Sequence, residues 1–262
     1  MNKKRLGTIA VILGFSLVIG ACVFSIAGKV VTEKAEDDEF KKISHSVSAD
    51  STVTTKETQT KTDSTSAPSA VTVPEGTQQP SHSTEELLAM NNECYAWISI
   101  KDTRISYPVM HTPNDPDKYL NRNFYGQYSS SGVPYMDARC TDDSDNKIIF
   151  GHHMNFGSMF SDLCKYTSRM FRDTHQDVLL ETRTDREIYK IFAVLQIKAN
   201  DYWYNFITAE TEKKYDKKIE YALKHTLYKT RIVPKFRQKL LTLSTCMGTE
   251  RDDRLLVIAV KQ

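Results

Sequence analysis

The amino-acid sequence predicts a mainly β protein with eight strands, carried on a membrane anchor and a disordered stalk. Three observations lead to this prediction. Eight short runs rich in Val, Ile, Leu and Thr lie between residues 96 and 260, separated by turn-forming residues. An uncharged, mainly apolar run occupies residues 6–28. The stretch between these two regions is dominated by serine and threonine.

Residues 1–5 are expected to form a cytoplasmic tail, and residues 6–28 a transmembrane signal anchor. The apolar run has 23 residues, and a helix rising about 1.5 Å per residue would extend roughly 35 Å, enough to cross a bilayer. Three basic residues at positions 3–5 should keep the amino terminus in the cytoplasm. A cleaved signal peptide, with its small-residue site at 25–27, is the alternative. A lipoprotein signal ending before Cys22 fits less well.

Residues 29–83 are predicted to form a flexible stalk. From Ser44 to Thr84, serine and threonine make up 19 of 41 residues, and no Phe, Trp or Tyr lies between Lys41 and Cys94. Such a stretch cannot bury enough apolar surface to offset the entropy lost on ordering. We therefore expect it to lift a folded domain, residues 84–262, off the membrane.

The folded domain is predicted to begin with a helix and to continue as an antiparallel or mixed β-barrel. Ser83 or Thr84 would cap the helix, whose apolar side includes Leu87, Leu88 and Met90. The strands are expected at residues 96–100, 105–109, 133–136, 147–151, 178–182, 188–199, 239–245 and 255–260.

Two insertions between the strands have apolar residues at helical spacing. Residues 158–166 carry Met159, Phe160 and Leu163, which should pack against the barrel. Residues 208–228 show a longer amphipathic pattern and lie between the sixth and seventh strands. We expect this long helix to cover core surface, to form one wall of a binding groove, or to do both.

Composition excludes several classes of protein. With 35 basic and 33 acidic residues the formal net charge is +2, and no basic stripe is interleaved with aromatic residues, so nucleic-acid binding is not predicted. There is no glycine-rich phosphate loop and no HExxH motif. The cysteines are odd in number and form no CxxC pair, which argues against a disulfide framework or a zinc site. All except Cys246 are interpreted as small buried hydrophobes: Cys22, Cys94, Cys140 and Cys164.

The residues suited to covalent chemistry lie at predicted strand ends. Residues 242–246 read Thr-Leu-Ser-Thr-Cys, and Arg254 follows Cys246 by eight positions, at the start of the next strand. A thiol nucleophile needs a neighbouring base or cation, and a donor for the oxyanion it generates. Arginine supplies that donor and keeps its charge. His152 and His153 end another apolar run; because adjacent strand residues face opposite sides, only one of them can easily point at Cys246.

This combination resembles the sortases, the cysteine transpeptidases of Gram-positive cell surfaces, whose signature is TLxTC with a downstream arginine and an upstream histidine at a strand end. Further segments in the same order resemble class B sortases: YAWISI at residues 95–100, YLNRNFYG at 119–126 and FGHHM at 150–154. The resemblance covers roughly residues 87–262. It implies an eight-stranded sortase-type β-barrel with an N-terminal helix and a long helix between strands six and seven.

The resemblance also implies roles for individual residues. Cys246 would be the nucleophile, and Arg254 would bind the substrate backbone and stabilise the oxyanion. His152 would be the general acid and base, because the family motif places this histidine directly after the glycine. Ser244 and Thr245 are candidate substrate-binding residues; a hydroxyl bonded to the backbone is the alternative for Ser244.

Two points of the site stay open at this level. Arg251 lies in the turn before the last strand and is a rival to Arg254, although Asp252 and Asp253 can neutralise it. A third member of the catalytic group cannot be selected, because many Asp and Asn residues are candidates.

The implied reaction is acyl transfer in two steps, which needs no metal or organic cofactor. Cys246 would cleave a Thr–Gly or Thr–Asn bond in a sorting motif near the carboxyl terminus of a secreted protein, and a peptidoglycan amine would release the thioester. The expected partners are those secreted proteins, the peptidoglycan precursor or cross-bridge, and the membrane through residues 6–28. The expected location is the cell membrane, single-pass, with the catalytic domain outside.

Three rival interpretations compete with this one. A cysteine endopeptidase, with water as the second nucleophile, would use the same three residues. A non-catalytic surface adhesin is disfavoured because all three residues are present. A pilin-polymerising sortase would usually carry a lid before the barrel and a carboxyl-terminal membrane segment, and the sequence predicts neither.

Overall fold

The structure, a computed structural model, describes residues 84–248 and 252–262, together with positions 28, 31, 34, 35 and 38. The predicted tail, anchor and stalk, at residues 1–5, 6–28 and 29–83, lie outside the described residues apart from those five positions, and they stay predictions. Within the described part of the chain, no helix combines the length and apolarity that crossing a membrane requires.

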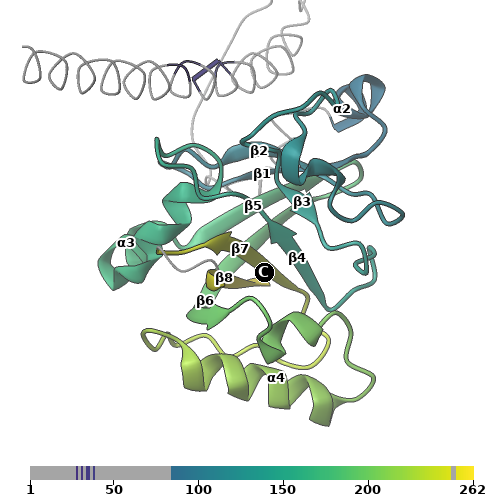
Figure 1. The fold of residues 1–262 in the computed structure, drawn as a ribbon. Coiled ribbons are helices and arrows are strands. Elements are labelled where there is room, and N and C mark those ends of the chain that lie inside the picture. Colours follow the sequence, from purple (N-terminus) through teal and green to yellow (C-terminus); the bar gives the residue numbers. More distant parts are fainter. Residues whose placement is uncertain (1–27, 29–30, 32–33, 36–37, 39–83, 249–251) are drawn as a thin grey trace, which may run out of the picture.

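Eight strands close into a barrel in the order β1-β2-β3-β4-β7-β8-β6-β5 (Figure 1). Two neighbouring pairs, β2–β3 and β4–β7, are parallel, and the other pairs are antiparallel, so the barrel is mixed. The mainly β prediction is therefore confirmed. The strands are β1 Cys94–Ser99, β2 Ser106–Met110, β3 Tyr135–Met136, β4 Asn146–Phe150, β5 Asp177–Thr182, β6 Arg186–Lys198, β7 Leu240–Cys246 and β8 Asp253–Lys261.

Strand β3 is shorter than the sequence indicates. The expected strand began at Val133, but the observed one begins only after Pro134. Proline lacks the backbone N–H that a strand ladder needs, which explains why β3 begins at Tyr135, two residues later than expected.

Helices occupy the predicted places, with differences in length and type. Helix α2, Thr84–Met90, precedes β1, and α4, Glu212–His225, lies between β6 and β7. Leu87 is buried as expected, whereas Met90 is 45% exposed and does not belong to the core. The insertion near residue 160 is a 3₁₀ helix, η2 Phe160–Thr167. Three further short helices were not predicted: η1 Lys118–Asn121, α3 Arg169–Thr174 and η3 Tyr202–Asn205.

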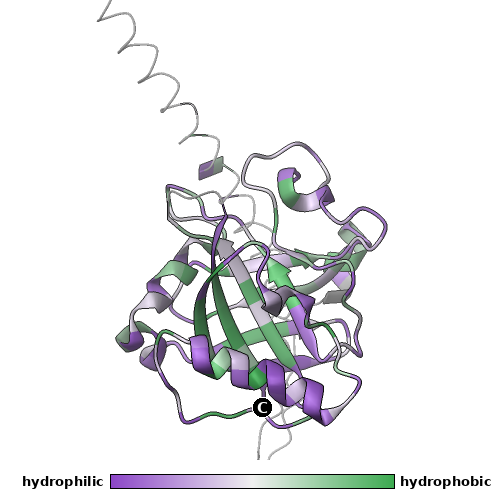
Figure 2. Cartoon of the chain, turned by 60° about the horizontal axis from the view of Figure 1, so that its bottom comes forward, coloured by the Kyte–Doolittle hydropathy of each residue, from purple (hydrophilic) through white to green (hydrophobic). Residues whose placement is uncertain are grey.

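Strand β8 is buried on both faces. Leu255, Val257 and Ala259 belong to the cluster that fills the barrel, while the alternate residues Leu256 and Ile258 belong to a second cluster. That second cluster includes Trp203 of η3, Phe206 directly after it, and three residues of α4: Tyr215, Ile219 and Ala222. Figure 2 shows α4 lying across the largely hydrophobic strands of the barrel. Since each fully buried aliphatic or aromatic side chain contributes about 1.5–3 kcal/mol, the η3–α4 insertion is held firmly against one outer face of the sheet.

Candidate active site

The ends of β7 and β8 bring the predicted thiol and guanidinium together. Cys246 is the last residue of β7 and is exposed, and its register partner across the ladder is Arg254 of β8. Side chains directly opposite each other in an antiparallel pair have Cβ atoms about 4.5–5.5 Å apart. Arg254 also donates from its Nη1 to the carbonyl oxygen of Asp253, at 3.0 Å. The rival Arg251 lies outside the described residues.

Strand β4 leads to His152, which lines the same pocket as Cys246 and Arg254. It pairs in parallel with β7, so that Phe150 lies opposite Ser244, and the Gly151 N–H donates to the Ser244 carbonyl at 3.0 Å. His152 follows two residues after the last paired position of β4 and lines the same pocket as Cys246. The glycine is required here, because a Cβ at position 151 would lie 2.6 Å from the ring of Phe160.

The ring of His152 is oriented by the backbone. Its Nε2 lies 2.8 Å from the carbonyl oxygen of Leu120, which can only accept, so Nε2 carries a proton and donates. Nδ1 is then the nitrogen left to exchange a proton with a reacting group. Among the residues that the structure describes, no carboxylate bonds to His152. The group that orients the His152 ring is therefore a main-chain carbonyl of η1, and the choice of a third catalytic side chain stays open.

His153 lies beyond the end of β4, in an isolated bridge with Met159, and contacts the main chain of Cys246. Its Nδ1 is 3.2 Å from the carbonyl oxygen of Cys246 and 3.6 Å from the Sγ of Cys164. Cys164 is only half-buried, and the interpretation of every non-catalytic cysteine as a buried hydrophobe is wrong for this residue. Cys94 and Cys140 are buried as expected, and burial raises the pKa of Cys94 to about 12 and that of Cys140 to about 11.

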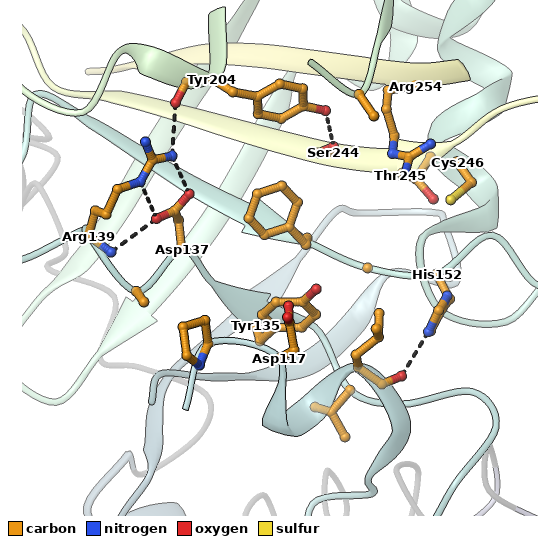
Figure 3. A pocket seen from close by; sticks show the side chains of 17 residues that line it. Asp117, Tyr135, Asp137, Arg139, His152, Tyr204, Ser244, Thr245, Cys246 and Arg254 are labelled. Atoms are coloured by element: carbon orange, nitrogen blue, oxygen red, sulfur yellow. Dashed lines mark hydrogen bonds and ion pairs between the residues drawn. The ribbon is translucent and has the colours of Figure 1, made fainter. Parts of the chain in front are cut away.

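A pocket of about 520 Å³ adjoins the predicted catalytic residues and has an aromatic wall. The rings of Tyr135, Phe150 and Tyr204 follow one another, with centroids 5.6 Å and 6.0 Å apart (Figure 3). Burial raises the pKa of Tyr135 and of Tyr204 to about 12, so both phenols stay protonated near neutral pH. This wall of the pocket therefore offers an apolar surface with neutral hydrogen-bonding groups.

The two candidate substrate-binding residues of β7 both line this pocket. The Ser244 hydroxyl lies 2.8 Å from the Tyr204 hydroxyl, so it bonds to a side chain. Thr245 is buried, and its Oγ1 has no hydrogen-bond partner within the described ranges. A buried hydroxyl without a hydrogen-bond partner lowers the stability of the folded protein, unless a bound molecule supplies the partner.

Several lining residues were missed by sequence reasoning. They come from short loops, single turns and the shortest strand, which carry no periodic signal: Asp117, Tyr135, Asp137, Arg139 and Tyr204. Leu120 lies within the YLNRNFYG segment that resembles class B sortases, but its role depends on a main-chain atom, and no side-chain pattern indicates it.

Comparisons with known proteins agree with this geometry. A sequence model of the sortase domain matches residues 98–262. Sortase B of Listeria monocytogenes serovar 1/2a (strain ATCC BAA-679 / EGD-e) is 30% identical over 169 residues, which are 64% of this chain and 68% of the relative. The X-ray structure of Clostridium perfringens sortase B superposes with a TM-score of 0.65 at 26% identity, covering 69% of this chain and all of that one. A Staphylococcus aureus sortase B–substrate complex has the same fold, with a TM-score of 0.64 at 22% identity over 68% of this chain and 83% of that one.

A closed eight-stranded barrel with a cysteine, a histidine and an arginine at one pocket defines a cysteine transpeptidase of the sortase type. The chain belongs to the sortase family, and within it to class B.

Proposed function

We propose that this class B sortase cuts a sorting motif near the carboxyl terminus of secreted proteins and joins the new carboxyl end to a peptidoglycan amine. The observation that carries the proposal is the convergence of Cys246, His152 and Arg254 from three strand ends on one pocket. The endopeptidase alternative differs only in the second nucleophile.

In the first step Cys246 gives its proton to Nδ1 of His152, and its sulfur attacks the scissile carbonyl carbon. A C–S bond forms, and Arg254 donates to the oxyanion of the tetrahedral intermediate. When the C–N bond breaks, His152 passes the proton to the departing amine, and a thioester remains. The Nε2–H of His152 stays on the Leu120 carbonyl throughout, so the ring does not have to turn.

In the second step an amine attacks the thioester carbon. His152 takes the proton from the attacking nitrogen and returns it to the sulfur as the C–S bond breaks. The product is a new amide, and the enzyme is regenerated without a cofactor. Sortase B from Staphylococcus aureus has been solved with a substrate, and a sortase B has been solved with triglycine, which supports proposing a peptide and an amine as the two substrates here.

The accepted nucleophile distinguishes transfer from hydrolysis. We expect the full chain, in detergent, to cleave peptides with Thr–Gly or Thr–Asn bonds from a peptide library. When triglycine is added, mass spectrometry should detect the amino-terminal cleavage fragment with three glycines joined to its new carboxyl end. Products that end only in a free carboxylate at every triglycine concentration would support the endopeptidase instead. A reaction without enzyme provides the background.

We also propose that residues 6–28 anchor the enzyme in the cell membrane, with the barrel outside; the apolar run and the preceding basic cluster support this. The full chain should sediment with membranes, and protease added to intact cells should cut within residues 29–83 and release a folded domain. A chain recovered from the medium with a new amino terminus near residue 28 would instead indicate a cleaved signal peptide.

A further inference from the structure

One wall of the pocket is held by a network that takes no part in the chemistry described above. Tyr204 is fixed at three points (Figure 3). Its hydroxyl lies 2.8 Å from the Ser244 hydroxyl, its ring stacks on Phe150 with an interplanar angle of 28°, and its carbonyl oxygen accepts from Nη2 of Arg139 at 2.9 Å. Two of these contacts come from strands β4 and β7, and the third comes from the loop after β3.

Arg139 can hold that carbonyl because Asp137 fixes the guanidinium. Nε and Nη2 of Arg139 donate to the two carboxylate oxygens of Asp137, at 2.9 Å and 2.7 Å. Although burial would raise the pKa of Asp137, hydrogen bonds from the side chain and N–H of Arg139 outweigh it and hold that pKa below its usual range. An isolated exposed ion pair contributes little, but this pair is bidentate and its carboxylate is only 11% exposed.

The loop that carries this pair is itself fixed to the barrel. The Asp137 N–H donates to the carbonyl of Ile148 in β4, at 2.8 Å. Tyr204, by contrast, belongs to η3, in the long insertion between β6 and β7. Arg139 therefore connects the barrel rim to the insertion across one end of the pocket, as Figure 3 shows for the labelled side chains.

We propose that Arg139, held by Asp137, is a positioning residue that sets Tyr204 as one wall of the peptide groove. This inference rests on the proposed function, since it assigns peptide binding to the pocket. The bonds that the described residues give Arg139 and Asp137 run to each other and to the main chain, so the pair acts on binding of the peptide and leaves the bond-breaking step alone. The planar fork of arginine is required, because one side chain must reach both a carboxylate and a carbonyl.

Steady-state kinetics of the full chain on one cleaved peptide test this assignment. A hydrogen bond from a charged donor is typically worth about an order of magnitude in binding. Arg139→Met should therefore raise KM on the order of 10-fold while kcat stays within about 3-fold. Arg139→Lys keeps the positive charge but lacks the planar fork, so its KM should lie between that of the parent and that of Arg139→Met. The matched control is Arg169→Met, which removes an exposed ion pair with Asp173 on α3, away from the pocket, and should change neither constant.

Two measurements separate positioning from general stability. Arg139→Met should speed hydrogen exchange at residues 202–206 and leave β7 and β8 as in the parent. In a double-mutant cycle, Tyr204→Phe should raise KM by a smaller factor in the Arg139→Met background than in the parent. The reason is that the Tyr204 ring is already displaced in that background. Unchanged KM, a fall in kcat as large as the rise in KM, or fully additive effects would each overturn the assignment.

Failure of the proposed function gives a different result. If the parent cleaves no peptide, the proposed function fails, and hydrogen exchange at residues 202–206 alone decides the positioning role. Faster exchange there in Arg139→Met supports it, and unchanged exchange overturns it.

Discussion

Replacing Cys246 with alanine is expected to reduce cleavage and transfer to background. The thiol supplies the nucleophile that attacks the peptide in the proposed reaction, and removal of such a nucleophile typically costs about 10⁶-fold in kcat. The fold should survive, because Cys246 is exposed at the end of β7 and the change removes one heavy atom from its side chain. Mass spectrometry of the peptide products, together with thermal unfolding of parent and variant, tests both parts.

Cys164 provides a matched control for this prediction. It lies close to the main chain of Cys246, and Cys164→Ser should keep substantial activity because its thiol is outside the proposed reaction. Iodoacetamide at pH 8 should modify Cys246 and inactivate the parent, while Cys94 and Cys140 stay unmodified because burial holds both thiols protonated. A thioester adduct trapped in Cys246→Ala would show that another residue is the nucleophile.

Replacing Arg254 with alanine is expected to cause the second-largest loss of activity. Losing an oxyanion donor typically lowers turnover about 100- to 1000-fold, and we expect a loss on that scale. Arg254 lies within β8, where the ladder to Cys246 on one side and to Ile197 of β6 on the other holds its backbone. Regular elements position catalytic groups better than loops do. Initial rates on one peptide, compared with the parent, measure the effect.

Two further variants sharpen the assignment of Arg254. Arg254→Lys should recover little, because lysine lacks the planar fork. Arg251→Ala should stay within a few-fold of the parent, since Arg251 is followed by two aspartates in the sequence and exposed pairing contributes only about 0–1 kcal/mol. If Arg251→Ala were the more damaging change, the roles of the two arginines would have to be exchanged.

The barrel, and the nearness of the cysteine and arginine that are proposed for catalysis, could be predicted because they depend on local patterns. Most strands contain a short apolar run, and β8 could be recognised although it is buried on both faces, since Leu255–Val260 contains no polar residue. Cys246 and Arg254 are close in sequence and lie at the facing ends of consecutive antiparallel strands, which places them opposite each other. The choice of His152 over His153 came from the resemblance to sortases and stays a prediction.

The remaining features of the site depend on pairing between strands that are far apart in the chain. His152 and Cys246 meet only because β4 and β7, far apart in the chain, lie in parallel with Phe150 opposite Ser244. The group that orients His152 is a main-chain carbonyl, and every residue has one, so no residue type could indicate Leu120.

The wall of the pocket could not be predicted from the sequence for the same reason. Arg139 and Tyr204 lie in segments without periodicity, and the bond between them joins a side chain to a backbone oxygen 65 positions away. The sequence by itself determined the eight strands, the two longer helical segments and the residue types at the strand ends, because apolar periodicity and residue type are local properties. Only the closed barrel decided which loops face one another, because that depends on the register of strands distant in the chain.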